Sequence, residues 1–212
     1  MRKRTNLKRV RKALGDHLDD YHRSLGEFVA IFSQVESTLV RSLWVLAHME
    51  APYAQAVLSG VRVDGAMGYI NRIAEAEGWP KERKGDWQRI FTQLGLLNKL
   101  RNDLLHHGAA MFGSVWVVSN EKVVHHPARR REIHITPKIL RAAADDLSAI
   151  MTLLILLGGE RVGIVVRANR ASWMRKLRRG AWRYKQPPQA DWVRMMDQLL
   201  QKRPRLLRSS QA

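Results

Sequence analysis

The sequence predicts an all-α protein: a helical bundle with a small β-hairpin insertion and a basic extension at each end. Apolar residues recur every three or four positions over much of residues 16–158, the period of a helix buried on one face. Within residues 114–135 the helical period is lost, and short runs typical of strands take its place. The net charge of +18 gathers at the two ends of the chain. We therefore expect a basic arm over residues 1–15, the bundle over residues 16–158, and a basic, partly helical extension over residues 159–212.

Three helices are expected in the first half of the bundle. Residues 26–49 predict a long helix, whose apolar face consists of Phe28, Ile31, Phe32, Val35, Leu39, Leu43 and Leu46. Residues 51–60, which include Pro52, predict a break. Residues 63–77 predict a shorter helix with Asp64 as its N-cap.

The third helix is expected over residues 84–107, followed by a glycine at position 108 that suits a left-handed cap. Its apolar stripe consists of Trp87, Ile90, Phe91, Leu94, Leu97, Leu104 and Leu105.

A β-hairpin is expected next, with strands over residues 114–118 and 122–124 and a possible third short strand over residues 131–135. Thr136 and Pro137 form a good N-cap and first-turn pair for a helix. That helix is expected to end at Leu157 and, from its apolar content, to be the most buried one.

The extension offers two weaker helices, around residues 172–183 and 191–202, separated by Pro187 and Pro188.

The composition excludes several classes of protein. There are no cysteines, so disulfides and thiolate metal sites are excluded and a reducing, cytoplasmic compartment is expected. The most apolar stretch, residues 149–157, is nine residues long. About 18 are needed to cross a bilayer, so no membrane span is expected. The basic N-terminus is followed by no apolar stretch and does not resemble a secretory signal.

The charge is distributed unevenly. Residues 1–12 carry seven basic side chains and no acid, and residues 159–212 carry 14 against three acids. The segment between them is neutral. Basic arms favour a polyanion through Coulomb attraction and counterion release. Nucleic acid is therefore the expected partner, with a solubilising tail as the alternative.

The end of the third helix carries the most specific group of polar residues. Arg101, Asn102, His106 and His107 stand just before the glycine at position 108. An arginine can clamp anionic oxygens, and a histidine can move protons near neutral pH. On a helix Arg101 and His106 lie about 140° apart, so they do not simply point together. The long arginine would reach around, or the two would meet across a dimer seam.

The helical wheel also predicts a partner for this arginine. Asn98 and Arg101 fall inside the apolar stripe of the third helix. A guanidinium on a packed face requires a partner, because burying an uncompensated charge costs several kcal/mol. Glu36 lies within the apolar arc of the first helix. We predict that Glu36 approaches Arg101 or Asn98 across the interface of the two helices.

Residues 101–106 resemble the Arg-Asn-x-x-x-His motif of the HEPN superfamily, a family of helical bundles, and His107 fits the variant with one more intervening residue. Residues 32–36, which run from Phe32 to Glu36, are similar to a signature common before such motifs. The resemblance covers roughly residues 20–158.

What the resemblance implies is metal-independent RNA cleavage, without a cofactor, in a toxin or defence system. The ribose 2′-hydroxyl would attack the adjacent phosphate, with His106 as general acid or base. Arg101 would stabilise charge on the phosphate, and Asn102 would orient one of these groups. Sites in the family commonly assemble across a homodimer, and an antitoxin or other protein could be a further partner.

Two other classes of function remain open. Many members of the superfamily bind or scaffold without shown catalysis, so the chain can be a non-catalytic nucleic-acid-binding or regulatory protein, or a structural partner protein. In a purely structural interpretation, Glu36 satisfies Arg101. The helix dipole then favours His106 and His107 at the helix C-terminus.

Metal binding is not expected. His125, His126 and His134 lie in the predicted strands and loops. The one carboxylate four residues from any of them, Glu121, also falls in the hairpin and not on a helix.

Two further basic segments are candidates for nucleic-acid contact. Arg129, Arg130 and Arg131 form a loop that could hold phosphate or be merely solvated. The extension interleaves aromatic and cationic side chains, as single-strand binders do: Trp173, Arg175, Lys176, Arg178, Arg179, Trp182, Arg183 and Lys185. The alternatives are that Trp173, Leu177 and Trp192 pack back on the bundle, or that the helix lies on an anionic membrane surface.

Overall fold

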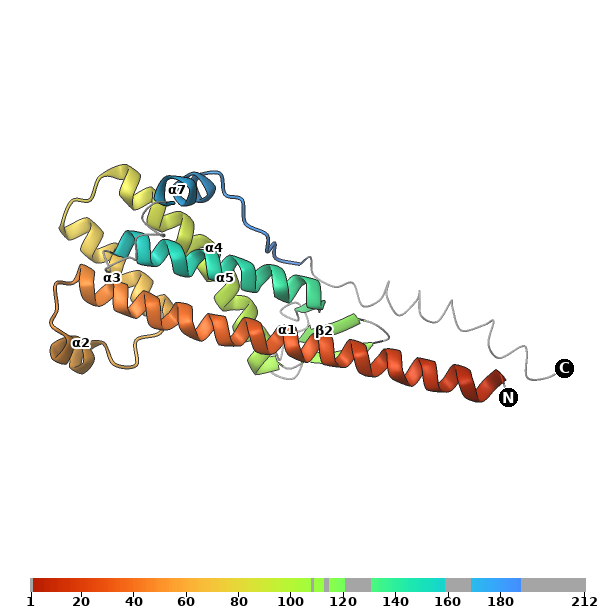
Figure 1. Cartoon of the computed structure of the whole chain (residues 1–212). Coiled ribbons are helices and arrows are strands. Elements are labelled where there is room, and N and C mark those ends of the chain that lie inside the picture. Colours follow the sequence, from red (N-terminus) through yellow and green to blue (C-terminus); the bar gives the residue numbers. More distant parts are fainter. Residues whose placement is uncertain (1, 108, 113–114, 121–130, 159–168, 188–212) are drawn as a thin grey trace. The chain divides into compact units, whose positions relative to one another are not determined.

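The computed structural model describes residues 2–107, 109–112, 115–120, 131–158 and 169–187. These ranges contain six helices and three strands: α1 Arg2–Leu46, α2 Ala51–Leu58, α3 Val63–Ala76, α4 Lys81–His107, β1 Ala109–Phe112, β2 Val115–Ser119, β3 Glu132–Ile135, α5 Pro137–Gly158 and α7 Arg170–Arg178 (Figure 1). The chain forms two compact units. The first is Met1–Asn102 with Thr136–Gln186, and the second is Asp103–Ile135 with Pro187–Ala212. The mostly helical character expected from the sequence is confirmed.

The central helix of the first unit is α1, which runs unbroken from Arg2 to Leu46. The backbone of the expected N-terminal arm is therefore part of this helix, not a separate segment. The predicted apolar face is buried as expected, with Phe28, Phe32 and Leu39 at most 2% exposed.

Helix α5 lies beside α1 and runs in the same direction (Figure 1). Arg141, near the start of α5, donates to Asp20 of α1 at 2.8 Å. Towards the other end of α5, the carbonyl of Leu154 accepts a hydrogen bond from the Ser42 hydroxyl at 3.4 Å. Twelve of the 22 residues of α5 are buried. The predicted cap is present, since Thr136 Oγ1 accepts from the backbone N–H of Ile139.

The expected break over residues 51–60 contains a helix, α2, so this prediction was wrong. Pro52 is in the first turn of α2, where a proline costs nothing because those N–H groups have no partner inside the helix. Ala54 and Leu58 hold α2 against the rest of the unit through their buried side chains.

Helix α3 begins close to its predicted position, but Asp64 is not its N-cap. Arg62 occupies the N-cap position and makes no side-chain capping bond, while Asp64 is in the first turn. A carboxylate in the first turn still interacts favourably with the helix dipole.

Helix α4 extends to Lys81 and buries most of its predicted stripe, including Trp87, Leu94 and Leu104. Leu105 departs from the prediction, with 47% of its surface exposed. It lies about 100° around the helix from Leu104, which takes it off the buried face.

The sheet of the second unit is antiparallel, in the order β1-β2-β3. Strands β2 and β3 match two of the expected strands, and in the register Val117 faces His134. Strand β1 was not predicted; it pairs with β2 with Ala110 opposite Val117. The expected strand over residues 122–124 lies outside the described residues.

The first part of the basic extension packs against the helices of the first unit. Leu177 of α7 is 1% exposed and Tyr184 is 3% exposed. Asp146 of α5 accepts hydrogen bonds from the backbone N–H groups of Arg183 and Tyr184, at 2.9 and 2.8 Å. Residues 169–186 therefore belong to the bundle, which differs from the expected division at residue 159. The expected helix over residues 191–202, with Trp192, is outside the described part.

Within the described residues, one segment is long and apolar enough to cross a membrane by length and composition alone. It is Gly15–Leu46 of α1. Its apolar side chains form the core of the bundle against α5 and α3, so packing accounts for them and no membrane span is inferred.

Candidate functional site

Arg101, the most specific residue of the sequence motif, is half-buried on α4. Its Nη1 donates to Asn102 Oδ1 at 2.9 Å. The guanidinium carbon lies 5.8 Å from the centroid of the Phe32 ring, close enough for a cation–π interaction. The neighbouring amide and the aromatic ring of α1 therefore hold the guanidinium in place. The contact between Phe32 and Arg101 was not foreseen from the sequence, which assigned Phe32 to the apolar face and to the signature over residues 32–36.

The predicted pairing with Glu36 is not formed. In the described part of the chain, Glu36 makes no hydrogen bond or ion pair, and Arg101 has no carboxylate partner. The amide of Asn98 donates to both carboxylate oxygens of Asp64 at 3.2 Å. The carboxylate that contacts α4 at Asn98 is therefore Asp64, in the first turn of α3, and not Glu36 of α1.

Other arginines of the first unit are neutralised. Arg178 donates to both carboxylate oxygens of Asp86, and Arg183 pairs with Asp145. Arg141 pairs with Asp20. Arg101 differs from these three because, within the part of the chain that the structure describes, its guanidinium is held in position without a carboxylate beside it.

The histidines of the motif stand in the last turn of α4. The boundary between the two compact units falls within this helix, after Asn102, so both histidines belong to the second unit. His106 is exposed. His107 Nε2 lies 3.7 Å from Asp103 Oδ1, and its buried Nδ1 has no hydrogen-bond partner among the described residues. Of the predicted catalytic residues, the structure brings Arg101 and Asn102 into contact.

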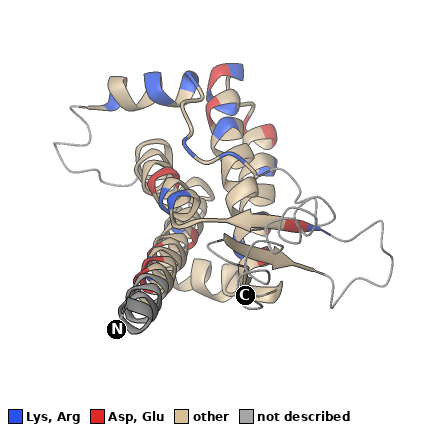
Figure 2. Cartoon of the chain, turned by 90° about the vertical axis from the view of Figure 1, so that its right-hand side faces the viewer, with Lys and Arg blue, Asp and Glu red and all other residues tan. Residues whose placement is uncertain are grey.

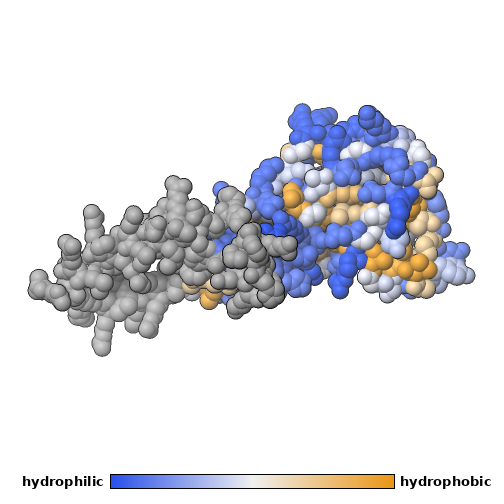
Figure 3. Space-filling model, turned by 180° about the vertical axis from the view of Figure 1, so that it is seen from behind, coloured by the Kyte–Doolittle hydropathy of each residue, from blue (hydrophilic) through white to orange (hydrophobic). Residues whose placement is uncertain are grey.

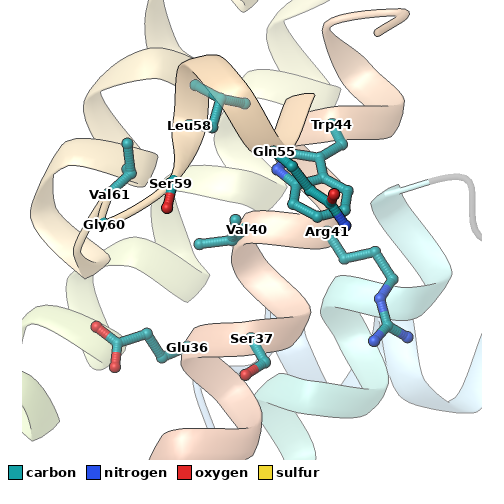
Figure 4. Close-up of a pocket in the computed structure, with 10 residues that line it drawn as sticks. All are labelled: Glu36, Ser37, Val40, Arg41, Trp44, Gln55, Leu58, Ser59, Gly60 and Val61. Carbon is teal, nitrogen blue, oxygen red and sulfur yellow. The ribbon is translucent and has the colours of Figure 1, made fainter. Parts of the chain in front are cut away.

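Glu36 lines a different feature, a cavity of about 510 Å³ between α1, α2 and the connection to α3 (Figure 4). Val40 and Ser59 project toward the space between these segments, whereas the guanidinium of Arg41 points away from it. The indole Nε1 of Trp44, which also lines the cavity, is buried and has no hydrogen-bond partner. This cavity was not predicted, because the residues of α2 were expected to form a break.

The predicted nucleic-acid contacts fall into three groups. Arg131, Arg175, Lys176, Arg179 and Lys185 are exposed. Arg178 and Arg183 are bound to the carboxylates given above, while Trp173 and Trp182 are half-buried. Arg129 and Arg130 lie outside the described residues.

Helix α7 presents basic side chains and no acidic one (Figure 2). Lys176 Nζ lies 5.1 Å from the centroid of the Trp173 ring. Leu177 is buried, as the packing alternative expected for it. The helix thus packs through its apolar side while Arg175 and Lys176 stay in solvent.

Metal-binding side chains do not gather in the described ranges: no three His, Cys, Asp or Glu come together there. His125 and His126 are outside those ranges.

No family model, curated protein or solved structure matches this chain. The resemblance to the HEPN superfamily therefore depends on the motif residues alone.

Proposed function

We propose that the chain is a metal-independent endoribonuclease of HEPN type, in which Arg101 grips the phosphate that is cleaved. The observation that carries the proposal is the state of Arg101: held by Asn102 and Phe32, half-buried, and without a carboxylate partner among the described residues. A guanidinium that is already held in place and has no carboxylate of the protein as its partner can use its whole charge to bind an anionic ligand.

The held Arg101 guanidinium would act in catalysis by electrostatic stabilisation of the transition state. Charge develops on the phosphate oxygens as the phosphorus becomes pentacoordinate, and a donor already in place stabilises that charge without reorganisation. Removing one such donor typically lowers kcat by about 10²–10³. Asn102 acts on the guanidinium, since it fixes the plane of the Arg101 fork by accepting from Nη1.

In the proposed reaction the ribose 2′-oxygen forms a bond to phosphorus while the bond from phosphorus to the 5′-oxygen breaks. The 2′-hydroxyl loses a proton and the leaving 5′-oxygen gains one. His106 performs one of these transfers as general acid or base. A second copy of the chain would supply the other group, as in family members that assemble their sites across a homodimer.

The test is cleavage of end-labelled RNA in EDTA. We expect the wild-type protein to cut, and Arg101→Ala and His106→Ala each to lose at least about 100-fold in rate. The matched control is Arg62→Ala, which removes an exposed arginine at the start of α3 that makes no capping bond. Equal cleavage by wild type and Arg101→Ala would refute the role of Arg101.

Helix α7 supports a second candidate, a non-catalytic RNA-binding protein. Its exposed Arg175, Lys176 and Arg179, with Lys176 beside Trp173, combine phosphate contacts with a ring on which a base can stack. This function predicts binding that survives Arg101→Ala and His106→Ala but is lost when Arg175, Lys176 and Arg179 are all changed to alanine. Substitution is preferable to deletion here, because residues 169–186 are packed in the bundle.

A further inference from the structure

We propose that Arg89 of α4 and Arg178 of α7 together bind one phosphate of the RNA, at a site held in place by the buried carboxylate of Asp86. The inference rests on the proposed function for the identity of its ligand. The site is separate from the one at Arg101, because Arg89 precedes Arg101 by twelve residues, about 18 Å along the axis of α4. All four residues belong to the first compact unit.

One carboxylate joins the two arginines where α7 lies beside the start of α4 (Figure 1). Asp86 Oδ1 accepts from Arg89 Nη1 at 3.3 Å and from Arg178 Nε at 3.2 Å. Asp86 Oδ2 accepts from Arg178 Nη2 at 3.0 Å. Each guanidinium thus has a nitrogen within 3.3 Å of the same oxygen atom. At this spacing one phosphate, which has several acceptor oxygens, can contact both groups.

The two arginines carry more positive charge than Asp86 can neutralise. One carboxylate is bonded to two guanidinium groups, so one positive charge remains. The Asp86 side chain is 5% exposed, whereas those of Arg89 and Arg178 are 47% and 50% exposed. An anion that arrives from solvent therefore meets the two guanidinium groups and not the carboxylate.

The second arginine does not serve to attach α7. Arg178 links α7 to α4, because it reaches Asp86 from the other helix. Arg89 stands three residues after Asp86 on the same helix, so its bond joins no further segment. What Arg89 adds to the arrangement is a second positive charge. Elsewhere in the described part of the chain, the ion pairs of arginine have one cation for each carboxylate: Arg141 with Asp20, and Arg183 with Asp145.

Both guanidinium groups are held before a ligand arrives. Arg178 bonds to Asp86 through Nε and Nη2, an arrangement that fixes the plane of its fork. Arg89 Nη1 also lies 3.3 Å from the position that a Cβ at Gly85 would occupy, so the glycine leaves room for it. Of the five N–H donors of each guanidinium, Asp86 takes two from Arg178 and one from Arg89. Within the described ranges no other acceptor bonds them, so the rest can bind a phosphate with little further loss of side-chain freedom.

A second carboxylate, that of Glu82, influences the site without cancelling its charge. The hydrogen bond and the charge of Asp86, and to a smaller degree the charge of Glu82, raise the pKa of Arg178. Arg178 therefore stays protonated throughout the physiological range of pH. Glu82 is exposed, so solvent and salt weaken its effect on an incoming anion. Its neighbours in the sequence, Lys81 and Arg83, are both cationic.

The cations of α7 favour a polymer over a single phosphate ion. Arg175 is exposed and stands three residues before Arg178, which places the two on the same side of the helix. Lys176 and Arg179 are exposed as well. Successive phosphates of an RNA strand can contact these side chains in addition to the pair at Asp86, which a single phosphate ion cannot do.

The experiment measures binding of a 2′-O-methyl dodecauridine by the full chain in EDTA, using fluorescence anisotropy. The methylated sugars lack the attacking hydroxyl, so binding is separated from cleavage. We expect Arg89→Gln to weaken binding about tenfold, as the loss of one charged phosphate contact. The slope of the logarithm of the binding constant against the logarithm of salt concentration should become less negative by about 0.7.

Two further variants control for charge and for geometry. Arg141→Gln removes the same charge from a side chain that is also 50% exposed but is paired one to one with Asp20, and it should change binding less than about twofold. Arg178→Lys keeps the charge but loses the fork, and it should weaken binding severalfold. Circular dichroism melting shows whether each variant is folded. Arg89→Gln, at an exposed position of α4, decides the matter if Arg178→Lys does not fold.

Several outcomes would overturn the inference. One is that the wild type binds no RNA, and another is that it binds RNA no more tightly than Arg89→Gln does. An equal loss in Arg141→Gln would mean that RNA responds only to net charge. Binding to phosphatidylserine vesicles that depends on Arg89, with no effect of Arg89→Gln on RNA, would assign the site to a membrane surface.

Cleavage assays separate this site from the one at Arg101. Arg89→Gln should raise the KM for a cleavable RNA and leave kcat unchanged, whereas Arg101→Ala lowers kcat. RNA binding that depends on Arg89 in a protein that does not cleave RNA would retain this site and remove the nuclease. Cleavage that depends on Arg101 but binding that ignores Arg89 would do the reverse.

Discussion

Asp146 shows how much a single buried carboxylate can organise. It is 3% exposed and accepts from the Gln93 side chain at 2.9 Å as well as from two backbone N–H groups of the extension. The Gln93 amide also donates to the carbonyl of Tyr184. This one carboxylate therefore ties α4, α5 and residues 183–184 together. Its role depends on partners 37 and more positions away in the sequence.

We expect Asp146→Ala to lower the free energy of unfolding by about 3 kcal/mol, because it leaves buried backbone donors without an acceptor. The adjacent Asp145→Ala is a matched control. Asp145 is 52% exposed, and in the described part of the chain it pairs with the exposed Arg183 alone, so its loss should cost less than about 1 kcal/mol. Urea unfolding of both variants checks the prediction, which would be contradicted by equal losses.

Ionisation of the buried Tyr21 phenol should lower the free energy of unfolding at alkaline pH. Its side chain is 2% exposed, and burial raises the pKa of the phenol to about 12. A phenol whose pKa is higher in the folded state stabilises the fold fully below pH 10, the ordinary value, and loses that contribution as the pH rises to about 12.

The free energy of unfolding of the wild type should therefore fall relative to that of Tyr21→Phe between pH 10 and 12. Denaturant unfolding of the two proteins at matched pH values measures the difference. A constant difference over this range would show that the phenol does not ionise differently in the two states.

At the scale of elements, the close approach of α1 and α5 depends on a glycine. A Cβ added at Gly158 would lie 2.5 Å from Ser42 Oγ and 2.8 Å from Ser42 Cβ. The second distance cannot be relieved by rotating the hydroxyl. The ends of these two parallel helices are therefore set by the absence of a side chain at position 158.

Gly158→Ala should lower the free energy of unfolding by about 1–3 kcal/mol, the usual cost of overpacking a well-packed contact. Thermal unfolding of the single variant and of the double variant with Ser42→Gly tests the cause. Ser42→Gly removes both clashing atoms. The free energy of unfolding should therefore fall less in the double variant than the sum of the losses in the two single variants. Strict additivity would rule out this contact as the cause.

Helix α2 is an element that was not predicted from the residues that form it. Its eight residues contain Pro52, the residue on which the prediction of a break over residues 51–60 was based. Proline is a helix breaker only inside a helix, and here it is in the first turn. Two large side chains of α2, Tyr53 and Val57, are 66% and 67% exposed. Figure 3 shows that hydrophobic residues also gather on the surface of the described part when it is seen from behind.

At the scale of the whole molecule, charge predicts how RNA binding responds to salt. The chain carries a net charge of +18, and residues 2–12 hold seven basic side chains without an acid. If about six cations contact single-stranded RNA, the logarithm of the binding constant should fall with the logarithm of salt concentration with a slope of about −4.

Deleting residues 2–12 should bring that slope closer to zero than deleting residues 188–212, which hold five basic and two acidic side chains. Anisotropy titrations with one RNA between 50 and 300 mM salt measure both slopes. The same slope for all three proteins would mean that neither end contributes to RNA binding.

Much of the fold was predictable because it depends on local periodicity. The buried face of α1 through Phe28, Phe32 and Leu39, the Thr136 cap of α5 and the position of strand β2 are all consequences of residues close together in sequence. The candidate site was predictable only in part. The residues Arg101 and Asn102 were identified, but the partner chosen for Arg101 was wrong.

The sequence by itself determined which faces of the helices are apolar, the approximate bounds of α3, α4 and α5, and that a basic chain carries an Arg-Asn-x-x-x-His motif. Tertiary structure alone decided that Asn98 meets Asp64, that Arg101 has no carboxylate partner among the described residues, and that Glu36 and Trp44 share a cavity. The physical reason is that helical periodicity defines the face on which a side chain lies but not which other helix meets that face. Charged groups find their partners only once distant segments pack.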